Sequence, residues 1–81
     1  MNIYWIKYEK DKQSFKVPEA LGFNVLKLSN PEEIDKIIYD LINQDYKTLI
    51  ISNEIASFSE DIIKKYNKSN QVNIIIASKK E

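Results

Sequence analysis

Cysteine, histidine and arginine are absent from this 81-residue chain, and glycine occurs only once. Without cysteine no disulfide can staple so small a domain, which excludes a secreted disulfide scaffold. Without histidine and cysteine, the usual zinc sites, Ser-His-Asp triads and Cys-His nucleophiles are excluded as well. We therefore expect no metal, no cofactor and no enzymatic activity of the chain's own.

An excess of charge of one sign is also lacking, because 12 lysines balance 12 acidic residues. Duplex nucleic acid is bound through several neutralised phosphates, often with the arginine fork, so nucleic acid is not an expected partner. Tyr4, Trp5 and Tyr8 resemble a stacking platform, but without a basic groove they are better interpreted as sheet core. Apolar runs are far shorter than the roughly 20 residues that span a bilayer. We expect a cytoplasmic protein with no membrane insertion, acting on protein partners.

Phosphate-binding loops need glycines, and Gly22 precedes a predicted strand instead of following one. Neither a dinucleotide fingerprint nor a P-loop is present. A phospho-receiver domain would need an acceptor aspartate at the end of the third strand, where Ser52 stands. Ser52 also lacks a histidine that could activate it as a nucleophile. A degenerate receiver-like domain is kept as an alternative.

The apolar pattern predicts strands that alternate with helices. Strands are expected over residues 2–8, 24–28, 46–51 and 72–77, helices over 18–22, 31–44 and 57–68, and a solvated tail over 78–81. Ser29 with Glu32, and Ser57 with Glu60, have the spacing of capping boxes. This β-α-β-α-β-α-β order predicts a single small α/β domain with a four-stranded, mainly parallel sheet and helices on both faces. The short first crossover leaves an antiparallel first pair open.

Two pairs of neighbouring acids could be imagined as a general acid and base. Glu32 and Glu33 begin one predicted helix, and Glu60 and Asp61 begin another. Acidic side chains in a first helical turn stabilise the helix dipole, so neither pair needs a catalytic explanation.

Four stretches of the chain carry a family resemblance. They are residues 20–25, 29–33, 46–56 and 72–78, which are similar to the family segments "Leu-Ala-Gly", "Asn-Pro-Glu-Glu", "Thr-Glu-Glu-Ile-Ala" and "Pro-Ser-Lys". From Ala20 onward the chain thus resembles the F subunit of the V-type and A-type ATPases (ATP synthases), a small component of the central stalk. The segment before Leu21 lacks the family's Phe-Arg, and the chain stops at Glu81 without the family's C-terminal helix. The resemblance therefore implies a short, diverged member.

The resemblance implies a parallel sheet with flanking helices and a non-catalytic role, coupling or regulation of ATP-driven ion transport by contact with the stalk. Such a chain would be peripheral to a membrane ATPase complex. We expect the partner contact at the end of the third strand, at Ser52, Asn53, Glu54, Ile55 and Phe58. The competing interpretation is that Ile55 and Phe58 only close the core. A stand-alone, self-associating regulatory domain that forms a homodimer is the alternative function.

Overall fold

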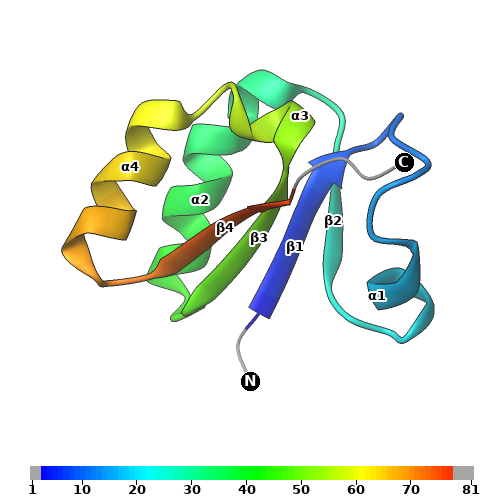
Figure 1. Ribbon diagram of the computed structural model, residues 1–81, viewed down its shortest axis with the longest axis horizontal. Helices are drawn as coiled ribbons and strands as arrows, with labels where there is room; N and C mark the ends of the chain where they lie inside the picture. Colours follow the sequence, from blue (N-terminus) through cyan, green and yellow to red (C-terminus); the bar gives the residue numbers. More distant parts are fainter. Residues whose placement is uncertain (1–2, 78–81) are drawn as a thin grey trace.

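A four-stranded parallel sheet organises the chain in a computed structural model that describes residues 3–77 (Figure 1). The strands are β1 (Ile3–Tyr8), β2 (Val25–Leu28), β3 (Thr48–Ser52) and β4 (Asn73–Ala77), in the spatial order β2-β1-β3-β4. All three neighbouring pairs are parallel, which settles the question about the first pair. The predicted α/β class and four-stranded sheet are confirmed, and the predicted tail lies outside the described residues.

Helical segments occupy the three connections between the strands. They are α1 (Lys16–Ala20), the 3₁₀ turn η1 (Pro31–Glu33), α2 (Ile34–Asn43), α3 (Asn53–Ala56) and α4 (Glu60–Ser69). The first helix begins two residues before Pro18, which we had expected at its first position. It ends where predicted, because Gly22 adopts φ 88°, a left-handed conformation that glycine enters without steric cost.

The helix caps differ from the two predicted capping boxes. Asn30, not Ser29, caps the turn before α2, since its side chain accepts a hydrogen bond of 3.1 Å from the amide of Glu32. Ser59, not Ser57, occupies the N-cap position of α4, and its hydroxyl donates to the Asp35 carboxylate of α2. Both predictions were wrong because other residues with capping side chains lie one or two positions away, and the path of the chain decides which of them occupies the N-cap position.

The helices cover the two faces of the sheet unequally. The chain moves one way across the sheet from β1 to β2 and the other way from β2 through β3 to β4. With right-handed crossovers, α1 then lies on one face and α2 and α4 on the opposite face. Figure 1 shows α2 and α4 together and α1 apart from them. Helices on both faces are confirmed, but one face has only the five-residue α1.

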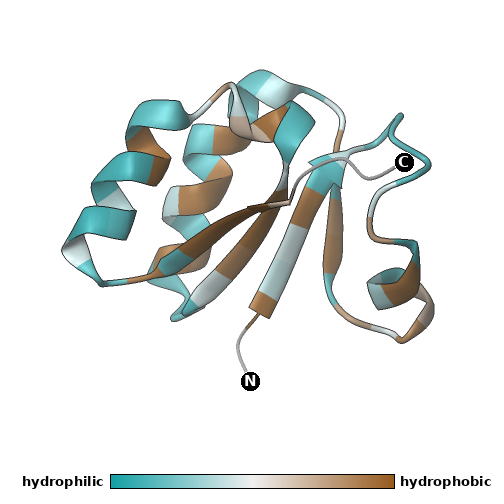
Figure 2. Cartoon of the chain, in the orientation of Figure 1, coloured by the Kyte–Doolittle hydropathy of each residue, from teal (hydrophilic) through white to brown (hydrophobic). Residues whose placement is uncertain are grey.

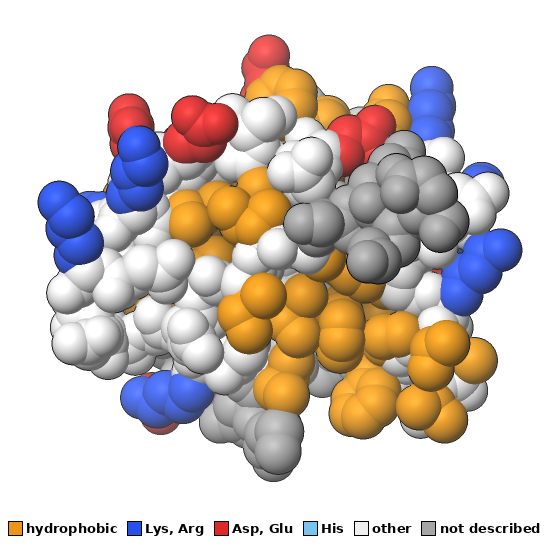
Figure 3. Space-filling model, in the orientation of Figure 1, with side chains coloured by type: hydrophobic (Ala, Val, Ile, Leu, Met, Phe, Trp, Pro, Cys, Tyr) orange, Lys and Arg blue, Asp and Glu red, His pale blue; other side chains and the backbone are white. Residues whose placement is uncertain are grey.

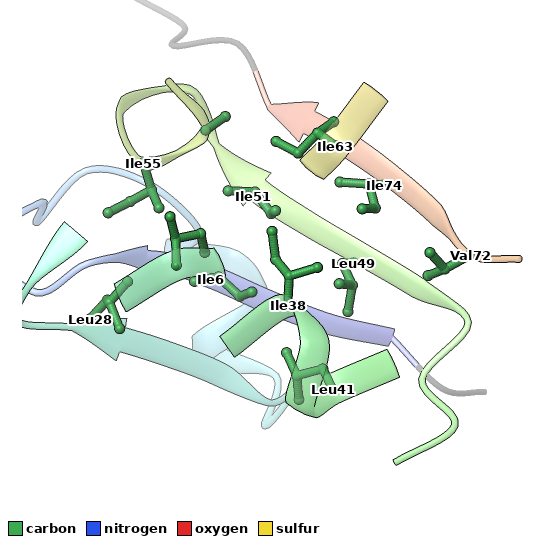
Figure 4. Packing of buried hydrophobic residues seen from close by; sticks show 12 residues of the cluster. Ile6, Leu28, Ile38, Leu41, Leu49, Ile51, Ile55, Ile63, Val72 and Ile74 are labelled. Atoms are coloured by element: carbon green, nitrogen blue, oxygen red, sulfur yellow. The ribbon is translucent and has the colours of Figure 1, made fainter. Parts of the chain in front are cut away.

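The hydrophobic core fills the space between the sheet and the larger helical layer. Its members are mostly aliphatic: Ile6, Leu28, Ile34, Ile38, Leu41, Leu49, Ile51, Ile55, Ala56, Ile63, Val72 and Ile74. The close-up shows strand and helix side chains pointing toward one another (Figure 4). The hydropathy colouring shows hydrophobic residues along the strands and hydrophilic residues interspersed along the helices (Figure 2). The buried residues of α2 are Ile34, Ile38 and Leu41, which are spaced to lie on one face of the helix. Fully burying one such side chain contributes about 1.5–3 kcal/mol.

The outer edge of β4 is closed by a side chain of α4. The Asn67 side chain donates to the Ile74 carbonyl at 3.1 Å and accepts from the Ile74 amide at 2.9 Å. It thereby occupies the backbone groups that a further strand would use. The β4 segment 73–77 contains no charge and no proline, the usual protections of an edge strand. Asn67 supplies that protection instead.

We expect Asn67→Ala to lower the free energy of unfolding by about 1–3 kcal/mol, because each of the two lost hydrogen bonds contributes about 0.5–1.5 kcal/mol. The freed edge should also cause concentration-dependent association. Asn67→Asp keeps the acceptor for the Ile74 amide and should fall between the two. Urea unfolding and sedimentation velocity measure both effects, with Lys68→Ala as the control. Equal behaviour of Asn67→Ala and Lys68→Ala would contradict this role.

Candidate functional site

The sheet face that carries α1 presents a row of apolar side chains, one from each strand. Trp5 is paired in register with Val25 and Ile50, and Ile50 with Ile75. Trp5 packs against Phe15 and Phe23, at ring-centroid distances of 5.1 and 6.4 Å. Its indole nitrogen is buried without a hydrogen-bond partner.

Much of this apolar face is exposed to solvent. Val17, Leu21, Phe23 and Ile75 retain 68, 70, 51 and 44% of their accessible surface. Figure 3 shows hydrophobic side chains extending from the strands toward α1. We call this surface, made of Trp5, Val17, Leu21, Phe23, Ile50 and Ile75, the open face. A parallel sheet is normally covered on both sides, so the open face is a candidate contact surface.

A buried lysine organises the loop between β1 and α1. Lys7 is only 3% exposed, and its Nζ donates to the Ser14 carbonyl at 2.8 Å. The same Nζ lies 3.7 Å from Oε1 of Glu19, which also pairs with Lys27. A buried ammonium must be paired in this way. The sequence analysis missed Lys7 because a lysine within a strand usually indicates a solvent-facing position.

Asp11 holds the same loop from the other side. Its Oδ1 accepts hydrogen bonds from the amides of Gln13 at 3.0 Å and Ser14 at 3.1 Å. Burial by itself raises the pKa of Asp11, but the hydrogen bonds from Ser14 and Gln13 and the charge of Lys7 outweigh it and lower that pKa below its usual value. The Lys27 ammonium is the main cause of a lowered pKa at Glu19. Asp11 therefore stays ionised at neutral pH.

A hollow of about 250 Å³ lies beside this loop at the carboxyl ends of β1, β3 and β4. We call it the strand-end pocket; its lining is Asp11, Ser14, Ser52, Asn53, Glu54 and Ala77. Ser52 is 2% exposed, and its hydroxyl has no hydrogen-bond partner in the part of the chain that the structure describes. Ser52 also precedes α3, yet its side chain does not cap that helix.

The expected contact residues divide into two groups in the structure. Asn53 and Glu54 are exposed, and Phe58 is 49% exposed, so these three can reach a partner. Ile55 is fully buried in the core and Ser52 nearly so. The expectation that Ile55 contacts a partner directly is corrected, because α3 turns its side chain under the helical layer, where it packs against the sheet.

The described residues contain no group of three or more acidic side chains arranged to hold a metal. None of the helices within residues 3–77 has the length and apolar character needed to cross a membrane. The acids Glu32, Glu33, Glu60 and Asp61 lie exposed in the first turns of η1 and α4, as the helix-dipole interpretation predicts.

Acid should remove the stabilisation that Asp11 provides. A carboxyl whose pKa is lowered by folding stabilises the fold above its unfolded pKa, and this contribution is lost as pH falls through the folded pKa. We expect Asp11→Asn to be less stable than the native chain at pH 7, with the difference shrinking over the acidic range below the ordinary aspartate pKa of 3.8. Urea unfolding across this range measures it, with exposed Asp40→Asn as the control. A difference of constant size would contradict the assignment.

The comparisons with known proteins point to one family. No family model matches the chain, and no solved structure matches it significantly. The chain is 33% identical over 58 residues to the F subunit of V-type ATP synthase from two strains of Clostridium botulinum, Eklund 17B (type B) and Alaska E43 (type E3). The match covers 72% of this chain but 56% of each relative, so it spans little more than half of their length. A name that denotes one component of a synthase agrees with the expectation that the chain is not an enzyme by itself. Over these 58 residues the chain is similar to the F subunit of V-type ATP synthase, the family to which its sequence motifs also point.

Proposed function

We propose that the chain is a non-catalytic docking module that takes the place of the F subunit in a V-type or A-type ATPase. It would couple or regulate ATP-driven ion transport by contact with central-stalk subunits, on the cytoplasmic side and peripheral to the membrane. The observation that carries this proposal is the 33% identity to the V-type ATP synthase F subunit over 58 residues. The fold supports it, because the described residues offer surfaces for contact and no constellation for chemistry.

The proposed contact with the stalk is the segment around α3, through Asn53, Glu54 and Phe58. Phe58 is a large aromatic side chain with half of its surface exposed, close in sequence to two exposed polar residues. An aromatic anchor with a polar rim is the usual composition of a protein interface. Ile55 would act indirectly, by holding α3 against the sheet, and buried Ser52 would not touch the stalk.

Affinity purification of the tagged chain from its own cells tests the assignment. We expect ATPase stalk subunits to be recovered with the native chain. Phe58→Ala should weaken their binding by about 2 kcal/mol, the cost typical of truncating an aromatic anchor. Phe23→Ala is the matched control, because Phe23 is 51% exposed but belongs to the open face. Recovery of no ATPase component with the native chain would reject the proposal.

A second candidate function, self-association, is favoured by the open face. Two copies could bury their exposed Leu21, Phe23 and Ile75 side chains against each other. Analytical ultracentrifugation should then show a homodimer that Phe23→Ala weakens and Phe58→Ala leaves intact. A monomer at high protein concentration would reject self-association and leave the stalk proposal standing.

A further inference from the structure

The strand-end pocket lies at the point where the direction of the sheet's connections reverses. The chain leaves β1 toward β2 on one side, and the later strands β3 and β4 lie on the other side. In open α/β sheets, ligands bind beyond the carboxyl ends of the strands at this switch point. Asp11 follows β1, Ser52 ends β3 and Ala77 ends β4, so the pocket spans the switch point.

We propose that the strand-end pocket binds a primary ammonium group on a short alkyl chain, of the kind that ends a lysine side chain. The buried hydroxyl of Ser52 is the first observation behind this. It lines the pocket, is 2% exposed and has no hydrogen-bond partner among residues 3–77. Nearly all buried side-chain polar groups in native proteins are hydrogen-bonded, so this one points to a polar group entering the pocket.

The charges of the lining select a cation. Of the lining residues within 3–77, Asp11 and Glu54 are acidic and none is basic. The nearby Lys7 is not one of the lining residues, and its Nζ is engaged by the Ser14 carbonyl and by Glu19. An anion placed in the pocket would meet two carboxylates, whereas a cation would be attracted by both.

The donor pattern distinguishes an ammonium from other cations. A divalent metal ion needs a larger set of hard oxygen ligands, and no group of three potential acidic ligands occurs within residues 3–77. An ammonium donates three hydrogen bonds, which match one hydroxyl and two carboxylates. Asp11 keeps acceptor capacity for this, because only its Oδ1 receives the Gln13 and Ser14 amides. The Ala77 side chain offers an apolar wall for the alkyl chain.

Substitution of Ser52 allows an effect on ligand binding to be measured separately from an effect on stability. Because the Ser52 hydroxyl has no partner within the fold, Ser52→Ala should leave the melting temperature unchanged or raise it. The same substitution should weaken ammonium binding by about 10- to 150-fold, the range that one lost hydrogen bond to a charged group gives. Ser29→Ala is the matched control, since Ser29 is exposed at the end of β2, on the same edge of the sheet.

An NMR titration of the isotope-labelled chain with n-butylammonium tests the site. We expect saturable shifts of the amides of residues 11–14 and 52–54, and none with n-butanol, which lacks the charge. Tetramethylammonium carries the charge without N–H donors and should bind more weakly. The Lys79→Gln, Lys80→Gln variant is titrated in parallel, because these lysines follow Ala77 closely in sequence and could compete. Absence of saturable shifts in both chains, equal binding of tetramethylammonium, or unchanged binding by Ser52→Ala would overturn the proposal.

The source of the ammonium is distinguished by a second pair of probes. Nα-acetyl-lysine N-methylamide should bind, and its Nε-acetylated form should not, if the natural ligand is a lysine side chain of a protein. Binding of n-butylammonium alone would identify a small free amine instead; either result supports an ammonium site. No partner protein is present in these titrations. Their failure would therefore leave the ATPase proposal intact, and a failed affinity purification would leave the pocket proposal intact.

Discussion

The handedness of the crossovers between parallel strands governs how the helices are distributed about this sheet. With the order β2-β1-β3-β4, two of the three connections advance in the same direction and place α2 and α4 on one face. The third connection runs the opposite way and contains only α1. The positions of the core and of the open face follow from this unequal cover. The aliphatic core fills the well-covered face, and the open face and the strand-end pocket are left where little helix is available.

Successive side chains of a strand point to opposite faces of the sheet, so the unequal helical cover decides which side chains enter the core and which lie on the α1 side. On β1 and β3, the residues of the covered side are aliphatic, as at Ile6 and Ile51, and enter the core. Their neighbours Lys7 and Ser52 point to the opposite side, where the β1–α1 loop closes over them. Lys7 finds a carbonyl and a carboxylate there, but the Ser52 hydroxyl finds no partner. A buried polar group that folding leaves unpaired is most simply understood as one kept for binding.

The edge of β4 and the open face differ in how they are protected from contact with other chains. The hydrogen-bonding edge of β4 is blocked by Asn67, whereas the open face beside it keeps large apolar side chains in contact with water. This combination disfavours the addition of a strand and leaves contact through side chains available. A docking module whose partners pack onto a face or onto α3 has this pattern. Exposed Phe58 and the open face are separate surfaces, so assembly and self-association need not compete.

Local sequence information determined the elements and the fold class of this protein. The α2 stripe, the strand runs and Gly22 each specify their conformation through neighbours only a few residues away, and the absence of histidine and cysteine excluded most chemistry outright. The cap residues were misassigned because adjacent Ser and Asn residues have similar local signals. Burial of Lys7 and Ile55, the Asn67 contact with β4 and the orphan hydroxyl of Ser52 were decided only by the tertiary structure. Each of these features depends on contacts between segments that are distant in sequence and that the crossovers bring together. The apolar periodicity along one helix or strand does not contain that information.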